Sequence, residues 1–186
     1  MPDSKPGSAD LYLSFACLFQ RPDPDYANHF EEALTLWEQE IPSAGELVND
    51  LRKLCQEYPP GEDRLNFFWE HYIPLFETGR VEAPPYASVY LDGEGLVMGR
   101  ETLAVQAFYQ TAGYTISDLK QELPDHLAVE LEFAAVLAQA GKPELLKEFR
   151  QQHLLPFLRL ILPRITGSKR PLFPLAAQVL SLWQLG

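Results

Sequence analysis

Residues 84–91 read PPYASVYL and lead into Asp92-Gly93, at the centre of a long segment that cannot form one regular helix. Between residues 78 and 99 the chain carries two prolines and four glycines, which exclude a continuous helix. We therefore expect a long ordered loop over residues 78–99, held in place by the aromatic side chains of Tyr86 and Tyr90. The apolar residues on both sides of Asp92-Gly93 could instead pair as a short hairpin.

Helical periodicity dominates the rest of the chain, because apolar side chains recur every three or four positions. Proline and glycine mark most of the expected ends. We expect helices from Ser8 to before Pro22, from Asp23-Pro24 to before Pro42, from Ser43 to about Tyr58, from Asp63 to about Pro74, and over residues 100–113, 124–141, 143–165 and 171–185. The sequence thus predicts an all-α fold of about eight to ten helices, in a single domain over residues 1–186.

Local signals predict how some of these helices begin or bend. Asp23 precedes Pro24, so its carboxylate is expected to cap a helix that has proline at its first position. Ser43 and Glu46 have the spacing of a capping box. Pro156 is expected to bend the helix over residues 143–165.

The amino-acid composition indicates which kinds of partner the protein can bind and in which cellular compartment we expect it. Twenty-six acidic residues against fifteen basic ones give a net charge of -11, which repels nucleic acid and attracts cationic segments. Cys17 and Cys55 lack the spacing of a zinc or redox site, and two thiols do not make a disulfide framework. The apolar stretches are too short or too interrupted by charge and proline to span a membrane. We expect a soluble, cytoplasmic protein without stable membrane insertion.

Catalytic motifs are absent from the sequence. It contains no phosphate-binding loop, nucleophile elbow or HExxH helix. His126 and Glu130 lie four apart on one predicted helix, where they could share a metal ion or act as an acid-base pair. The alternative for these positions is that Asp125 places negative charge at the helix N-terminus while His126 bonds locally. We expect no enzyme, no metal and no cofactor, and a small metal-dependent enzyme using His126 and Glu130 stays as the alternative.

An aromatic run on the helix after Asp63 carries Trp69, Tyr72 and Phe76. These side chains spread over more than one helix face. Core packing is the ordinary role of such residues. The alternative is an apolar groove for a guest peptide, because binding a hydrophobic segment requires large aromatic surfaces.

Three short strings occur in a fixed order along the chain. They are PPYASVYL at residues 84–91, ELPDHL at 122–127 leading into ELEF at 130–133, and HLLPF at 153–157. In these strings the chain resembles the TorD/DmsD/NarJ-like family of molybdoenzyme assembly chaperones. That resemblance implies an all-helical fold of the TorD-like type.

The resemblance also implies a function and a site. Members of the family bind the twin-arginine signal peptide or the N-terminal region of a molybdenum-containing oxidoreductase subunit until cofactor insertion and folding are complete. Carried over to this sequence, the peptide-binding residues are Trp69, Tyr72, Phe76, Pro85, Tyr86, Ser88, Tyr90, Glu122, Pro124, Asp125 and His126. A second reading within the family is a NarJ-like assembly factor for a subunit that is not exported. Both a monomer and a homodimer formed by exchange of C-terminal helices are compatible with the sequence.

Overall fold

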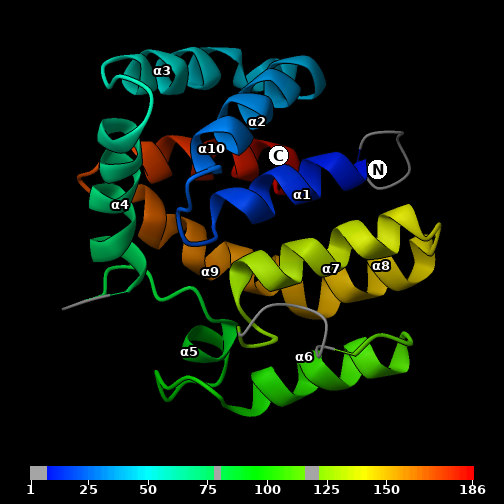
Figure 1. Ribbon diagram of the computed structural model, residues 1–186. Helices are drawn as coiled ribbons and strands as arrows, with labels where there is room; N and C mark the ends of the chain where they lie inside the picture. Colours follow the sequence, from blue (N-terminus) through cyan, green and yellow to red (C-terminus); the bar gives the residue numbers. More distant parts are fainter. Residues whose placement is uncertain (1–7, 78–80, 116–121) are drawn as a thin grey trace. The chain divides into compact units, whose positions relative to one another are not determined.

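The computed structural model describes residues 8–77, 81–115 and 122–186, and within them the all-α prediction is confirmed. Helices α1 to α10 make up the described fold, which contains no strand in those ranges (Figure 1). The chain divides into two compact units, of which the first comprises residues 1–16 and 85–160 and the second residues 17–84 and 161–186. Each unit is described by itself below. The expectation of one domain over residues 1–186 stays a prediction.

The second unit is built from helices that bury aromatic and aliphatic faces. Its elements are α2 (Tyr26–Glu40), the 3-10 turn η2 (Pro42–Ala44), α3 (Gly45–Gln56), α4 (Glu62–Phe76) and α10 (Leu172–Gln184). Trp37 of α2, Leu51 of α3 and Phe68 of α4 are fully buried. Helix α10 packs against α3, and the rings of Phe173 and Phe76 meet edge to face at 5.1 Å. Burial of these side chains stabilises the unit by about 1.5 to 3 kcal/mol each.

The first unit holds the strings that carry the family resemblance. Its elements are the beginning of α1 (Ser8–Leu18), α5 (Ala87–Leu91), α6 (Arg100–Thr111), α7 (Leu127–Gln139), α8 (Pro143–Phe149), the π-helical turn η4 (Arg150–Leu154) and the beginning of α9 (Leu155–Thr166). Helices α7 and α8 are joined by a short turn at Gly141, which has a φ of 63°, and they lie side by side (Figure 1). Rings of Tyr109, Phe133 and Phe149 pack together in its core.

The loop expected over residues 78–99 is interrupted by a helix. Residues 78–80 lie outside the described part of the chain, and residues 87–91 form the short helix α5. The hairpin around Asp92-Gly93 does not form, because Val89 and Leu91 belong to α5 rather than to a strand. Two prolines before α5 and three glycines after it limit this helix to about one turn.

Neither of the two N-terminal helix caps predicted from the sequence, Asp23 and Ser43, caps its helix in the structure. Asp23 accepts a hydrogen bond from the amide of Asp25 at 3.0 Å, but it closes a turn before α2, which begins at Tyr26. Ser43 lies inside the 3-10 turn η2, and the N-cap of α3 is Ala44, without a side-chain hydrogen bond. Proline fixes φ in the range that a 3-10 turn uses, so Pro42 favours the turn over the capping box.

Pro156 lies in the second position of α9, directly after the π-helical turn η4. Proline has no amide to donate, and its ring collides with the carbonyl four residues earlier in a regular helix. A π-turn widens the backbone at this place, so the helical path continues from α8 into α9. The expected perturbation at Pro156 therefore takes the form of a widened turn.

Candidate functional site

The segment before α5 and the segment before α7 pair along their backbones. The amide of Ala87 donates to the carbonyl of Asp125 at 2.9 Å, and the amide of Leu127 donates to the carbonyl of Pro85 at 2.8 Å. These bonds form an isolated antiparallel bridge between Tyr86 and His126. Two strings about forty residues apart in the sequence are thereby held side by side. We define these two segments, residues 85–90 and 122–126, as the paired-motif site.

Asp125 is the central side chain of the paired-motif site. It is fully buried, and its Oδ2 accepts a hydrogen bond from the amide of Ser88 at 2.9 Å. That amide lies in the first turn of α5, where helical amides have no partner within the helix. Asp125 thus caps α5 from a distant segment and fixes the position of Ser88. Its Oδ1 and the hydroxyl of Ser88 have no hydrogen-bond partner among the described residues.

Tyr86 connects the same two segments through its side chain. Its hydroxyl donates to Oε1 of Glu122 at 3.0 Å, and its ring meets the ring of His126 edge to face at 5.2 Å. Pro124 is held in turn by Tyr109 of α6, whose hydroxyl donates to the Pro124 carbonyl at 2.9 Å. Eight of the predicted site residues, counting Pro85, Ser88 and Tyr90, therefore lie in the paired-motif site of the first unit.

His126 is the N-cap of α7. Its Nδ1 accepts a hydrogen bond from the amide of Ala128 at 3.2 Å, so this nitrogen carries no proton in the folded protein. Burial lowers the pKa of His126 to about 4, although Glu122 and Asp125 act in the opposite direction. The local bonding expected of His126 is confirmed, whereas the helix begins at Leu127 rather than near Pro124.

Glu130 lies one turn further along α7 and is fully buried. Neither of its carboxyl oxygens has a hydrogen-bond partner among the described residues. Burial raises the pKa of Glu130 well above its ordinary value, and the charges of Glu101 and Asp125 raise it further. A neutral carboxyl group is a poor metal ligand. Within the described ranges, no group of three or more His, Cys, Asp or Glu side chains is arranged to hold a metal ion.

The third string lies next to α5 and α6. The ring of Tyr90 packs against the buried ring of Phe157 at 5.7 Å. His153 and Glu101 form a side-chain pair with 2.7 Å between Nδ1 and Oε1. Tyr90 is therefore positioned by α9 inside the first unit. The pairing of Glu101 with His153 was not predicted, because the two residues lie about fifty positions apart and neither stands in a recognisable spacing.

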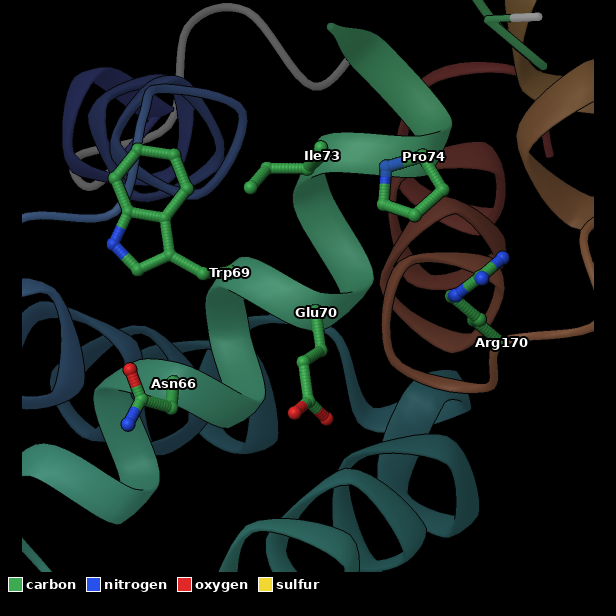
Figure 2. A pocket seen from close by; sticks show the side chains of 6 residues that line it. All are labelled: Asn66, Trp69, Glu70, Ile73, Pro74 and Arg170. Carbon is green, nitrogen blue, oxygen red and sulfur yellow. The ribbon is translucent and has the colours of Figure 1, made fainter. Parts of the chain in front are cut away.

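Trp69, Tyr72 and Phe76 belong to α4 of the second unit. Tyr72 and Phe76 are buried and pack on Phe173, with ring centroids 5.9 and 5.1 Å apart. Trp69 is only half-buried and lines a surface pocket of about 560 Å³. Figure 2 shows this pocket, whose other lining side chains are Asn66, Glu70, Ile73 and Pro74 of α4 and Arg170 from the segment before α10. Of the three predicted aromatic contacts, Trp69 thus lines this pocket, and Tyr72 supports its ring at 5.9 Å.

A comparison with protein families identifies the chain. The family described as nitrate reductase delta subunit matches residues 24–162, which include the paired-motif site and α4. The chain belongs to this family. The match confirms the resemblance carried by the three strings.

Relatives in the family are named as chaperones rather than as catalytic enzymes. A probable Tat proofreading chaperone DmsD of Haemophilus influenzae is 30% identical over 122 residues, which cover 62% of this chain and 60% of the relative. The chain therefore spans about 60% of that protein's length. A chaperone protein TorD of Vibrio cholerae is 25% identical over 175 residues, covering 85% of this chain and 79% of the relative.

A solved structure supports the fold. A redox enzyme maturation protein from Archaeoglobus fulgidus is similar with a TM-score of 0.61 and 24% identity, covering 97% of this chain and 93% of that chain. At this identity the likeness shows the fold alone. Among the described helices, none combines the length and the hydrophobicity needed to cross a membrane.

Proposed function

We propose that the chain is a cytoplasmic chaperone that binds the twin-arginine signal peptide or N-terminal region of a molybdenum-containing oxidoreductase subunit. It holds this segment until cofactor insertion and folding are complete. The observation that carries the proposal is the pairing of the Tyr86 and Asp125 segments by two backbone hydrogen bonds. Family membership supports it, since the relatives are named as chaperones.

The paired-motif site offers groups that suit a cationic peptide. Glu122 is half-buried and presents a carboxylate at this site, whereas the carboxylate of Asp125 is fully buried behind it and holds Ser88 in place. Guanidinium groups donate several hydrogen bonds to carboxylates in a fixed geometry. Exposed ion pairs contribute only about 0.2 to 1 kcal/mol each, whereas micromolar affinity requires about -8.2 kcal/mol. Apolar contacts must therefore supply most of the binding free energy.

Trp69 is the proposed apolar contact in the second unit. The pocket beside it has a hydrophobic wall from Ile73 and Pro74 and one carboxylate from Glu70. Tyr72 and Phe76 are buried, so in this proposal they position α4 and do not touch the peptide themselves. Tyr90 acts in a similar way in the first unit, because its ring packs on Phe157.

The first test is a calorimetric titration of the purified protein with leader peptides from candidate molybdoenzymes. We expect saturable binding, and we expect Tyr86→Ala and Asp125→Ala each to weaken it by about tenfold, which corresponds to roughly 1.4 kcal/mol. Thr111→Ala, on the exposed end of α6, is the matched control and should bind as the wild type does. Circular dichroism must show that all variants are folded. Unchanged affinity in both folded site variants would exclude the paired-motif site.

A second candidate function is a NarJ-like assembly factor whose client has no working export signal. The family description, which refers to nitrate reductase, favours this candidate. Each leader is therefore titrated beside a variant in which the two arginines are replaced by lysines. Weaker binding of the lysine variant supports leader recognition, and equal binding supports the assembly factor. Monomeric and exchanged dimeric forms are both compatible with these functions, and light scattering distinguishes them.

A further inference from the structure

Four large apolar side chains are exposed within eight residues of the first unit. Leu96, Val97 and Met98 in the segment after α5 and Leu103 on α6 are 63%, 47%, 70% and 65% exposed. We call these four residues the apolar patch. Single exposed apolar residues are ordinary, whereas four large ones within one short stretch of chain are a candidate surface for binding another molecule.

The segment that carries the apolar patch has a defined conformation. Both carboxylate oxygens of Asp92 accept from the amide of Glu101, at 3.1 and 3.2 Å. Between these anchors, Met98 has a φ of 63°, a left-handed conformation that residues with a side chain adopt only at a cost. Leu96 to Met98 are therefore exposed in a conformation that has two free-energy costs. One is the backbone strain at Met98, and the other is the contact of apolar side chains with water. Neither cost is offset by burial of these side chains within the described fold.

The apolar patch adjoins the paired-motif site. Gly99, which lies between Met98 and Leu103 of the patch, is packed so closely that a Cβ there would lie 3.5 Å from the Cβ of Ser88. Ser88 is the residue whose amide binds Asp125. Both surfaces belong to the first unit, so one ligand can touch both without spanning the two units.

Charge narrows the chemistry of that ligand. Between Pro84 and Leu103 the chain carries Asp92, Glu94 and Glu101 against one basic residue, Arg100. An apolar surface in a stretch of chain with net negative charge fits an apolar segment that is flanked by positive charge. We propose that the apolar patch binds the apolar stretch of the client's leader while the paired-motif site receives the adjoining basic residues. This inference rests on the proposed function and assigns a separate surface to the apolar part of the peptide.

The experiment titrates the wild type, two patch variants and one control variant with each of two peptides in a calorimeter. The patch variants are Leu96→Ser with Met98→Ser, and Leu103→Ser. The control is Leu182→Ser with Leu185→Ser, which removes exposed leucines from the C-terminal end of the second unit. The peptides are one leader and a version in which serine replaces the residues of its apolar stretch, with the arginines kept.

We expect the patch variants to bind the complete leader about tenfold more weakly than the wild type, since each contact buries one large apolar side chain. We expect no loss from the same variants with the serine-substituted leader, and no loss from the control with either peptide. An equal loss for both peptides, or equal affinity of patch and control variants for the complete leader, would overturn the inference and leave the proposed function standing.

Two further results of these experiments can be told apart from the losses of affinity described above. If the wild type binds no leader, the proposed function fails and the inference fails with it. If light scattering shows a wild-type dimer that the patch substitutions dissociate without changing leader affinity, the apolar patch is an interface between two copies of the chain. That result would also overturn the inference.

Discussion

At the scale of single residues, Glu130 links the stability of the fold to pH. Burial raises the pKa of its carboxyl group well above the ordinary value, so the folded state favours the neutral form. The same group is ionised in the unfolded chain at neutral pH, so the folded state binds the additional proton. The contribution of Glu130 to the free energy of unfolding is therefore present below about pH 4.5 and decreases as the pH rises.

We expect Glu130→Gln to remove this dependence. Glutamine keeps the shape of the side chain but has no proton to lose, so the free energy of unfolding should fall less between pH 5 and pH 8 than in the wild type. Urea denaturation at a series of pH values measures the difference. Parallel curves for the two proteins would show that Glu130 does not titrate differently in the folded state.

His126 produces the opposite dependence. Its pKa is lowered from 6.5 to about 4 in the folded protein, so the unfolded chain binds more protons between these values. Its contribution to the free energy of unfolding, on the order of 3 kcal/mol, is present above pH 6.5 and is lost as the pH falls toward 4. Asparagine also caps helices well but does not titrate. We expect His126→Asn to be less destabilised than the wild type between pH 6.5 and pH 4, and thermal melts at these pH values test this.

At the scale of helical elements, two helices of the first unit receive N-terminal caps from residues outside the helix. Asp125 caps α5, and Asp92 caps α6 through the amide of Glu101. A sequence pattern cannot identify such caps, because the capping residue is many positions away from the helix or precedes it by a whole loop. Local patterns were correspondingly wrong for Asp23 and Ser43, where a turn intervenes before the helix begins.

The cap on α6 leads to a prediction about Gly99. A Cβ at this position would overlap the carboxylate of Asp92 and displace it from the amide of Glu101. We expect Gly99→Ala and Asp92→Ala each to lower the free energy of unfolding by about 1 kcal/mol, and the double variant to lose about as much as either one. Gly45→Ala is the control, since a Cβ added at Gly45 would meet nothing within 4 Å. Additive losses in a double-mutant cycle would contradict the shared mechanism.

Sequence reasoning recovered the helices because their apolar periodicity is a local property. It missed α5, since prolines and glycines on both sides of residues 87–91 obscure a helix of about one turn. Only the family resemblance indicated that Tyr86 lies close to His126. A periodic sequence pattern cannot relate two segments that are about forty residues apart. The enclosure of Glu130 could not be predicted either, as the complete burial of a carboxyl group depends on every element packed around it.

At the scale of the whole molecule, the net charge of -11 should govern the rate of peptide capture. Electrostatic attraction raises association rates and is screened by salt, with a Debye length of about 10 Å at 0.1 M. We expect the association rate of a cationic leader to fall as salt rises from about 0.05 to 0.5 M, with a smaller change in the dissociation rate. Stopped-flow fluorescence measures both rates. The lysine-substituted leader carries the same charge and should show the same salt dependence, whereas an association rate independent of salt would exclude steering.

The division of the chain also has a consequence for its synthesis. The second unit combines residues 17–84 with residues 161–186, and α10 supplies buried side chains such as Phe173 to it. A nascent chain on the ribosome presents α2, α3 and α4 long before α10 exists, so the apolar faces that α10 covers stay open during that time. Closing the unit then requires contacts across the whole of residues 85–160, which is slow compared with local helix formation. A protein proposed to bind an incompletely folded client would thus itself stay incompletely folded until α10 has been synthesised.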